Sequence, residues 1–117
     1  EKEMSRCIRC YACRNVCPTC YCMHQCIAQT RKPNWMSQNT GTVEKKFFQI
    51  IRAIHNAGRC TDCGECQRVC PMGIPINLIN KKLGKEVLEL FSYTTGIDVE
   101  EKPPLMTFRE VEEKITD

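Results

Sequence analysis

Two stretches of the chain carry apolar residues at the three- and four-residue spacing that is typical of one face of a helix. In the first stretch the repeat consists of Val43, Phe47, Ile50, Ile51 and Ile54. Thr42 suits the N-cap of this helix, and Gly58 suits its C-terminal stop. The sequence therefore predicts a helix that ends just before residue 60.

The second stretch begins after Pro71, and Pro75 suits a first helical turn. Its apolar repeat consists of Ile76, Ile79, Leu83, Val87, Leu90 and Phe91. Gly84 interrupts the repeat, so the pattern predicts either one helix or two, and Gly96 is expected to end it.

The remaining segments carry breaker residues rather than a helical repeat. Residues 27–41 contain Pro33 and Gly41 and are predicted to form an irregular connector. Residues 93–117 are predicted to be an extended C-terminal tail, in which Thr107 and Glu110 have the spacing of a capping box that opens a last short helix. No stretch alternates as a strand does, so the predicted fold is mostly α.

The cysteines form two copies of one motif. Residues 7–18 read CIRCYACRNVCP and residues 60–71 read CTDCGECQRVCP. Three cysteines spaced three apart wrap a tight loop whose sulfurs meet three corners of an iron–sulfur cube, and the fourth ligand must come from elsewhere. In two-cluster ferredoxins the cysteine before proline ligates the other cluster.

The repeated motif thus predicts two 4Fe–4S clusters that exchange one ligand. The first cluster is assigned to Cys7, Cys10, Cys13 and Cys70, and the second to Cys60, Cys63, Cys66 and Cys17. With four thiolates on each cluster no iron has an open position for a substrate. This favours electron transfer over chemistry at the metal.

Composition and charge agree with a metal-binding chain. Eleven of the 117 residues are cysteine, an odd count that a purely disulfide-bonded framework would not use up. No signal segment opens the chain and no apolar run approaches the roughly 20 residues of a membrane helix, so we expect a cytoplasmic protein whose membrane contact is at most indirect. Two clusters of about −2 each would change the formal charge of +3 to about −1, which argues against a nucleic-acid surface.

The long link between the motifs, ending in a helix, resembles the alpha-helical ferredoxin family. The resemblance rests on CIRCYACRNVCP, on the helix before GRCTDCGECQRVCPMGI and on the helix after it, over about residues 4–92. An iron–sulfur subunit of heterodisulfide reductase is a member of this family, as are related electron-transfer subunits. The resemblance implies that the eight motif cysteines are the cluster ligands and that the two cluster-binding loops lie between helices.

The same resemblance implies an electron-transfer subunit inside a larger anaerobic redox complex. We expect a complex of the heterodisulfide reductase, hydrogenase or formate dehydrogenase type, with flavin- or metal-containing partner subunits. Residues 1–92 would form the two-cluster domain, and residues 93–117 would dock on a neighbouring subunit. Whether the chain catalyses a reaction itself is open, and a non-catalytic role is favoured because no nucleophile–base pair or phosphate loop is present.

Three cysteines fall outside the repeated motif. Cys20, Cys22 and Cys26 lie close together in the sequence with His24 among them. One interpretation is a third metal site, holding zinc or an additional iron–sulfur centre, with Cys20, Cys22, Cys26 and either His24 or a residue of a partner as ligands. Two alternatives stay open: reduced, buried thiols, or a changed assignment in which Cys17 joins this group. An alternative for the whole chain is a zinc-binding structural or interaction module.

Overall fold

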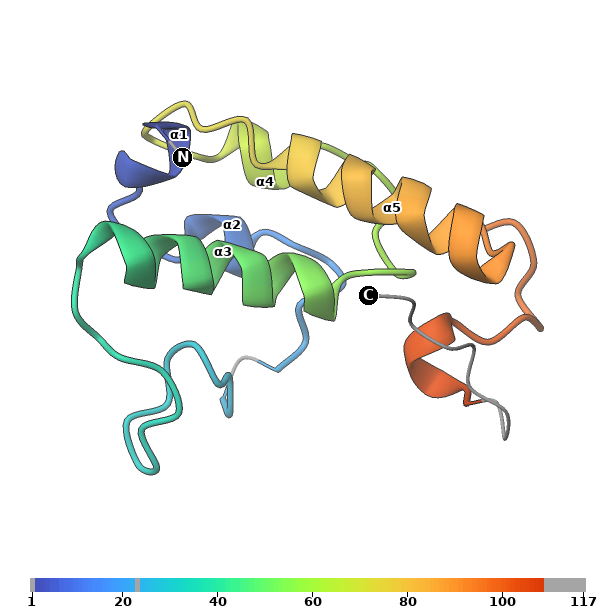
Figure 1. Ribbon diagram of the computed structural model, residues 1–117, viewed down its shortest axis with the longest axis horizontal. Helices are drawn as coiled ribbons and strands as arrows, with labels where there is room; N and C mark the ends of the chain where they lie inside the picture. Colours follow the sequence, from blue (N-terminus) through green and yellow to red (C-terminus); the bar gives the residue numbers. More distant parts are fainter. Residues whose placement is uncertain (1, 23, 109–117) are drawn as a thin grey trace, which may run out of the picture.

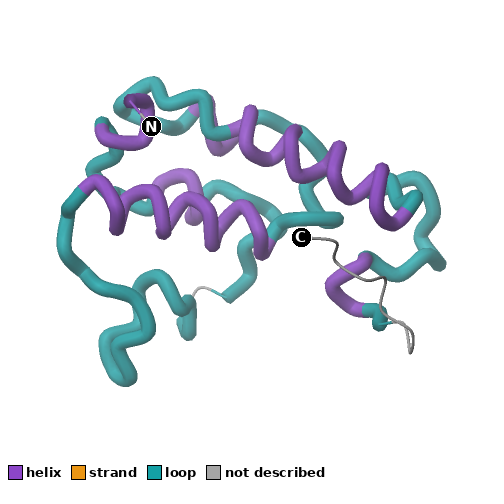
Figure 2. Tube along the Cα trace, viewed as in Figure 1, coloured by secondary structure: helices purple, strands orange, loops and turns teal. Residues whose placement is uncertain are grey.

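The computed structural model describes residues 2–22 and 24–108, and this part of the chain is helical (Figures 1 and 2). Its elements are α1 (Lys2–Ser5), α2 (Ala12–Asn15), α3 (Thr42–His55), α4 (Glu65–Arg68), α5 (Asn77–Phe91) and the 3-10 helix η1 (Pro104–Met106). Within the described residues there is no strand, only an isolated bridge between Arg31 and Asn34. The predicted mostly-α fold is confirmed.

Both long predicted helices form, with changes at their ends. α3 begins one residue earlier than predicted, because Gly41 rather than Thr42 takes the N-cap position, with an extended backbone and a carbonyl that accepts the N–H of Lys45 at 3.1 Å. α5 runs through Gly84 without a break. It ends at Phe91 rather than near Gly96, because Ser92 adopts the left-handed conformation and turns the chain so that Tyr93 is buried.

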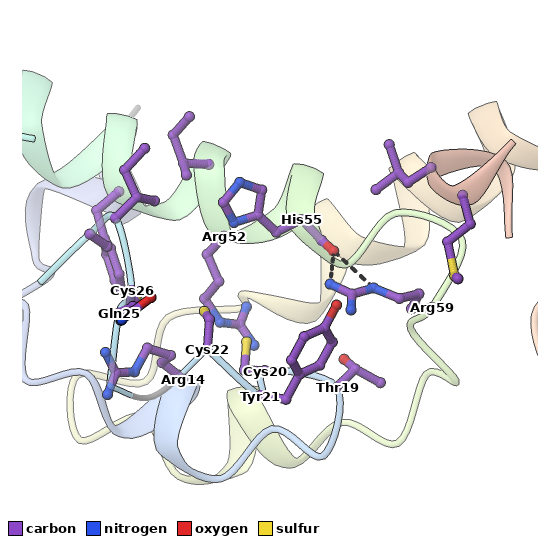
Figure 3. Close-up of a pocket in the computed structure, with 16 residues that line it drawn as sticks. Arg14, Thr19, Cys20, Tyr21, Cys22, Gln25, Cys26, Arg52, His55 and Arg59 are labelled. Atoms are coloured by element: carbon purple, nitrogen blue, oxygen red, sulfur yellow. Dashed lines mark hydrogen bonds between the residues drawn. The ribbon is translucent and has the colours of Figure 1, made fainter. Parts of the chain in front are cut away.

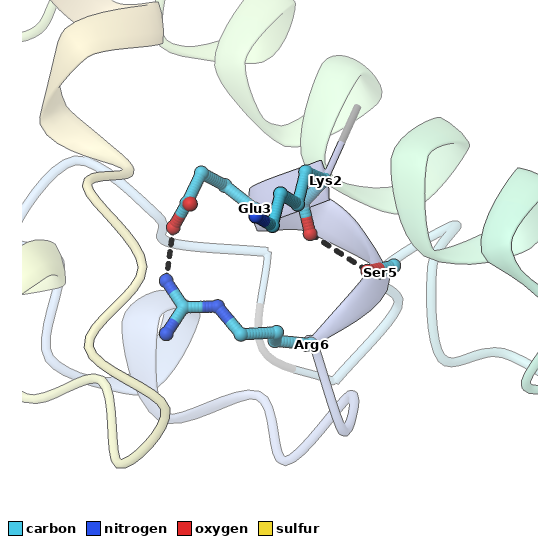
Figure 4. A network of polar contacts seen from close by, with 4 residues as sticks. All are labelled: Lys2, Glu3, Ser5 and Arg6. Carbon is cyan, nitrogen blue, oxygen red and sulfur yellow. Dashed lines mark hydrogen bonds and ion pairs between the residues drawn. The ribbon is translucent and has the colours of Figure 1, made fainter.

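The short helix α1 fastens the N-terminal end of the chain to α3. Its own turn is closed by Ser5 Oγ, which donates to the Lys2 carbonyl at 2.7 Å, and by an ion pair between Arg6 and Glu3 (Figure 4). Lys45 Nζ on α3 donates to the Ser5 carbonyl at 3.0 Å. The first cysteine motif therefore begins from a segment that is attached to the long helix.

The long helices frame the two cysteine motifs. α3 packs on α1 and on α5, and α2 packs on α4 (Figure 1). α2 and α4 are single helical turns inside the motifs, which the apolar pattern did not predict. As a result the segments that carry the two sets of cysteines lie next to each other.

α3 turns its polar side toward the interior. The apolar residues Val43, Phe47, Ile50 and Ile54 are 43–74% exposed. The buried residues of this helix are Phe48, Gln49, Arg52 and Ala53. A helix face that meets sulfur atoms rather than hydrocarbon has to supply hydrogen-bond donors, and this explains the inversion.

The hydrophobic core cluster of the described residues is built around cysteine. It consists of Cys7, Cys13, Cys26, Ala28, Met36, Phe48, Cys66, Ile74 and Ile76. The irregular connector contributes to it through Ala28 and Met36, so this segment is helix-free yet packed. Ile8, Val16 and Val69, which flank the motif cysteines, are instead exposed at the surface.

The described part of the tail lies partly against the domain. Pro103 has an extended backbone and leads into η1, and Pro104 approaches Gly58 closely. Thr107 follows η1, whereas Glu110, the other member of the predicted capping box, lies outside the described residues.

Replacing Gly58 by alanine is expected to destabilise the fold. Gly58 has a φ of +72°, and an added Cβ would lie 2.9 Å from Cδ of Pro104. The left-handed backbone alone costs a non-glycine residue about 1–2 kcal/mol. Anaerobic denaturant unfolding of the cluster-loaded protein should show a lower midpoint.

Gly84→Ala is the matched control for this substitution. Gly84 lies inside α5 with open space around an added Cβ. Alanine there should raise the midpoint by the equivalent of about 0.5–1 kcal/mol. Equal midpoints for Gly58→Ala and the unchanged protein would contradict the close approach of the tail.

Candidate metal centres

The two cysteine motifs adopt the same backbone conformation. Arg9 and Asp62, which occupy equivalent positions, have φ values of 52° and 61°. Tyr11 and Gly64, the next equivalent pair, have φ values of 60° and 76°. Left-handed residues at these two positions bend the loop tightly after the first and second cysteines.

The hydrogen bonds of the motifs also correspond. The carbonyl of Tyr11 accepts the N–H groups of Arg14 and Asn15 at 3.0 Å each, and Gly64 accepts from Gln67 and Arg68 at 3.1 and 3.0 Å. These bonds start α2 and α4 at the same point of each motif. The sequence repeat is therefore a structural repeat.

Backbone N–H groups point at the first cysteine of each motif. The N–H of Arg9 donates to Sγ of Cys7 at 3.4 Å. In the second motif burial raises the pKa of the Cys60 thiol, and a hydrogen bond from the N–H of Asp62 opposes that shift. Such donors stabilise a thiolate, which is the form that binds metal.

A small cavity brings together the four cysteines assigned to the first cluster. Cys7, Cys10 and Cys13 line it together with Cys70 of the second motif. Its other walls are mainly apolar and include Phe48, Met72, Ile74 and Ile76. The fourth cysteine thus reaches the cavity from the opposite motif.

The cysteines assigned to the second cluster are less enclosed. Charges on Cys66 and Cys17 act on the thiol of Cys60, so these three side chains are neighbours. Cys63 is exposed at the surface, as is Cys10 at the equivalent position of the first motif. Cys17 again comes from the other motif.

Hydrogen bonds around Cys17 favour its thiolate. A hydrogen bond from the Cys20 thiol is the largest of these contributions, and Thr19 adds to it. Together they outweigh the opposing effect of burial and lower the pKa of Cys17 to about 4. Thr19 Oγ1 lies 3.2 Å from the Cys17 sulfur and 2.6 Å from Oδ1 of Asn56, and its one hydroxyl proton can be donated to only one of the two at a time. Asn56 Nδ2 in turn donates to Cys20 Sγ at 3.5 Å.

Buried amide side chains on the long helices also face motif sulfurs. Nε2 of Gln49 lies 3.6 Å from Sγ of Cys7 and 3.9 Å from Sγ of Cys13. Nδ2 of Asn80 on α5 lies 3.6 Å from Sγ of Cys66. Both side chains are buried.

The apolar pattern alone did not reveal these donors. A signal was nevertheless present, because Gln49, Arg52 and Asn56 follow each other at helical spacing on the side of α3 opposite the apolar stripe. A polar stripe on a helix that leads into a cysteine motif indicates that the helix faces sulfur.

Arg52 lies among cysteines of both motifs. It is 4% exposed, and its Nη2 donates to the carbonyl of Cys13 at 3.1 Å. Burial opposes its charged form, but the nearby thiolates, with Cys13 and Cys66 the strongest, raise the pKa of Arg52 above its ordinary value. The guanidinium therefore stays positively charged.

The three additional cysteines line a separate, larger cavity of about 370 Å³ (Figure 3). Cys20, Cys22 and Cys26 share its wall with Arg52, His55 and Arg59, whereas His24 is exposed and outside the lining. Burial, followed by the neighbouring Cys26, raises the pKa of the Cys22 thiol.

No three Cys, His, Asp or Glu side chains of the described residues converge closely enough to hold a single metal ion. A four-iron cluster uses one cysteine at each corner, so its sulfurs stand farther apart than those around one ion. The third site stays a prediction.

The repeated motif, the cavity that Cys7, Cys10, Cys13 and Cys70 line together, and the helical frame define a helical two-cluster iron–sulfur domain. Residues 3–74 match the model of the 4Fe-4S dicluster domain family. The chain belongs to this family, and it carries two 4Fe–4S clusters. Among residues 2–22 and 24–108 no helix is long and apolar enough to cross a bilayer.

The chain is similar to parts of larger redox proteins. It is 32% identical over 105 residues to F420-dependent formate dehydrogenase subunit beta of Methanocaldococcus jannaschii, covering 90% of this chain and 27% of that protein. It is 34% identical to subunit beta of F420-dependent formate dehydrogenase 1 of Methanococcus maripaludis over 90% of this chain and 26% of that one. The chain thus spans about a quarter of these relatives.

A more distant relative comes from a different enzyme. The fumarate reductase iron-sulfur subunit of Mycobacterium tuberculosis is 30% identical over 79 residues, which are 62% of this chain and 31% of that subunit. The predicted membership of an iron–sulfur electron-transfer family is confirmed by these similarities and by the family match.

Metal analysis of the variant with both Cys22→Ser and Cys26→Ser tests the third site. If the site forms, the variant should lose zinc, or iron beyond the about eight atoms of two four-iron clusters. Retention of those eight irons is the internal control, because neither cysteine belongs to the repeated motifs. Identical zinc and iron contents in the variant and the unchanged protein would reject a third site.

Proposed function

We propose that this chain passes single electrons through its two clusters between redox sites of a larger complex, without catalysing a reaction of its own. The observation that carries the proposal is the position of Cys70, which lines the same cavity as Cys7, Cys10 and Cys13. Two clusters that exchange a ligand between their motifs are held close together. The distance over which an electron passes from one to the other is therefore short.

The same contact supports the proposed ligand sets. The first cluster is held by Cys7, Cys10, Cys13 and Cys70, and the second by Cys60, Cys63, Cys66 and Cys17. In support, the sulfur of Cys17 is close enough to Cys60 for their charges to interact, and α2 packs on α4. Four thiolates on each cluster leave its irons without an open position, as electron relay requires.

The partner is proposed to belong to a formate dehydrogenase of the kind that the archaeal relatives' names describe. Support comes from a similarity that covers 90% of this chain but only about a quarter of each relative. Flavin- or metal-containing parts of such a complex would be donor and acceptor. A cytoplasmic location is proposed because clustered cysteines bind metal more often than they form disulfides in a reducing compartment.

Residues 93–117 are proposed to dock on a neighbouring subunit, beside the two-cluster domain of residues 1–92. In the described part of this tail, Ile97 and Val99 are 78% and 96% exposed. The apolar stripe of α3, made of Val43, Phe47, Ile50 and Ile54, is a second uncovered surface. Exposed apolar groups gathered in this way are typical of protein–protein contacts.

Single Cys→Ser variants test whether the fourth cysteine of each motif binds the cluster of the other motif or the cluster of its own motif. With exchange, Cys70→Ser should perturb the same cluster as Cys10→Ser, and Cys17→Ser the same cluster as Cys63→Ser. Anaerobic electron paramagnetic resonance of the reduced proteins, with iron counts, gives the comparison. The unchanged protein should contain about eight irons per chain.

Two outcomes would contradict this assignment. One is the opposite pairing, in which Cys70→Ser matches Cys63→Ser. The other is an unchanged protein with about four irons. Cys22→Ser is the matched control, because it removes a thiol outside the motifs and should leave both cluster signals in place.

The variant with both Ile97→Glu and Val99→Glu tests the docking tail. Charges at these exposed positions should weaken association with the other subunits severalfold without unfolding the domain, since neither side chain is buried. The measurement is the amount of partner protein recovered with the tagged chain under anaerobic conditions.

The matched control for the tail variant is Lys102→Glu. Lys102 is exposed, and this substitution changes the charge of the tail by the same amount without removing an apolar side chain. It is expected to reduce recovery of the partner less than the double variant does. Unchanged recovery in the double variant would remove the proposed docking.

A further inference from the structure

Arg52 is a buried cation between the two cysteine motifs, with part of its hydrogen-bonding capacity unused. One of its N–H groups donates to the carbonyl of Cys13. Its Nε and Nη1 atoms are buried and have no partner in the described structure. Leaving two such donors unsatisfied costs free energy, so their retention indicates that they serve a group bound there.

The groups that act most strongly on this guanidinium are sulfurs of both proposed ligand sets. The two strongest are Cys13 of the first set and Cys66 of the second. Cys20, which belongs to neither set, comes next, followed by Cys17 of the second set. Arg52 therefore lies within electrostatic reach of both clusters rather than of one.

We propose that Arg52 is a tuning residue that raises the reduction potentials of both 4Fe–4S clusters by holding a fixed positive charge between them. This inference rests on the proposed ligand sets. An oxidised cluster with four thiolates carries a charge of about −2, and reduction by one electron makes it about −3. A nearby cation stabilises the more negative state more strongly, and burial keeps water from screening the effect.

Arg52 also reduces the repulsion between the two clusters. Two anionic clusters held close together disfavour each other's reduction, so the second electron enters less readily than the first. A cation between them offsets part of this cost at either cluster. The N–H groups on Nε and Nη1 add to the effect, because hydrogen bonds to cluster sulfur raise the potential in the same direction.

Arg14 provides a matched control for charge and burial. It is 6% exposed, but its guanidinium already has partners. Arg14 Nε and Nη2 donate to Asn15 Oδ1 at 3.3 and 3.2 Å, and Nη1 donates to the side chain of Gln29. Glutamine already stands at the equivalent position of the second motif, as Gln67. Arg14→Gln therefore removes a buried charge from the motif region without removing a donor that faces both ligand sets.

The experiment compares four proteins in potentiometric titrations monitored by electron paramagnetic resonance: the unchanged chain, Arg52→Gln, Arg52→Lys and Arg14→Gln. Each is reconstituted anaerobically and counted for iron first. Arg52→Gln should shift both midpoint potentials to more negative values. Arg52→Lys keeps the positive charge, so its midpoint potentials should lie much closer to those of the unchanged chain than the potentials of Arg52→Gln do. Arg14→Gln should leave both potentials close to those of the unchanged chain.

Some results would overturn the proposal. They are equal potentials in Arg52→Gln and the unchanged chain, a shift at one cluster only, or an equally large shift in Arg14→Gln. Should Arg52→Gln fail to hold eight irons, Arg52→Lys decides: retention of both clusters supports a need for charge, and their loss shows a packing role instead. An unchanged chain with fewer than eight irons would count against the ligand sets, so the two failures are distinguishable.

Discussion

Buried cysteine sulfur is the constraint on which the rest of this structure depends. Four of the nine residues in the main buried cluster are cysteine, and metal-bound sulfur carries negative charge that an apolar interior would not stabilise. Three parts of the chain supply the donors and the positive charge that stabilise this sulfur. The tight motif loops supply backbone N–H groups, α3 supplies Gln49 and Arg52, and α5 supplies Asn80.

The same constraint links folding to cofactor binding. With the proposed ligand sets each motif needs a cysteine from the other, so neither cluster would be completed until the segments before and after α3 have come together. Aliphatic packing alone is thin, because the fully buried large side chains are few and include Asn56 beside Phe48, Ile74 and Ile76. Metal–sulfur bonds that close the long link therefore contribute to folding free energy as well as to function.

Much of this arrangement could be predicted from the sequence, and the exceptions have physical causes. The helices were predictable because their period is local. The proximity of the two motifs was expected because the repeated cysteine spacing is that of ferredoxins whose motifs exchange a ligand, and α2 does pack on α4. Which face of α3 is buried was not predictable, because hydrophobic periodicity assumes an apolar interior. Val43 and Ile50 instead point away from the interior of this domain. Gly84 was ambiguous because one glycine costs a helix only about 1 kcal/mol, which packing on α3 can offset.

The polar inner face of α3 also explains why the domain exposes apolar side chains. A helix whose inner side is committed to sulfur must place its remaining hydrophobic residues outside, where Phe47 and Ile54 would be unfavourable for a free-standing protein. In the proposed complex a neighbouring subunit would cover these side chains. Charge compensation on one side of α3 and apolar contact on the other are thus two consequences of the same helix lying against the metal-binding motifs.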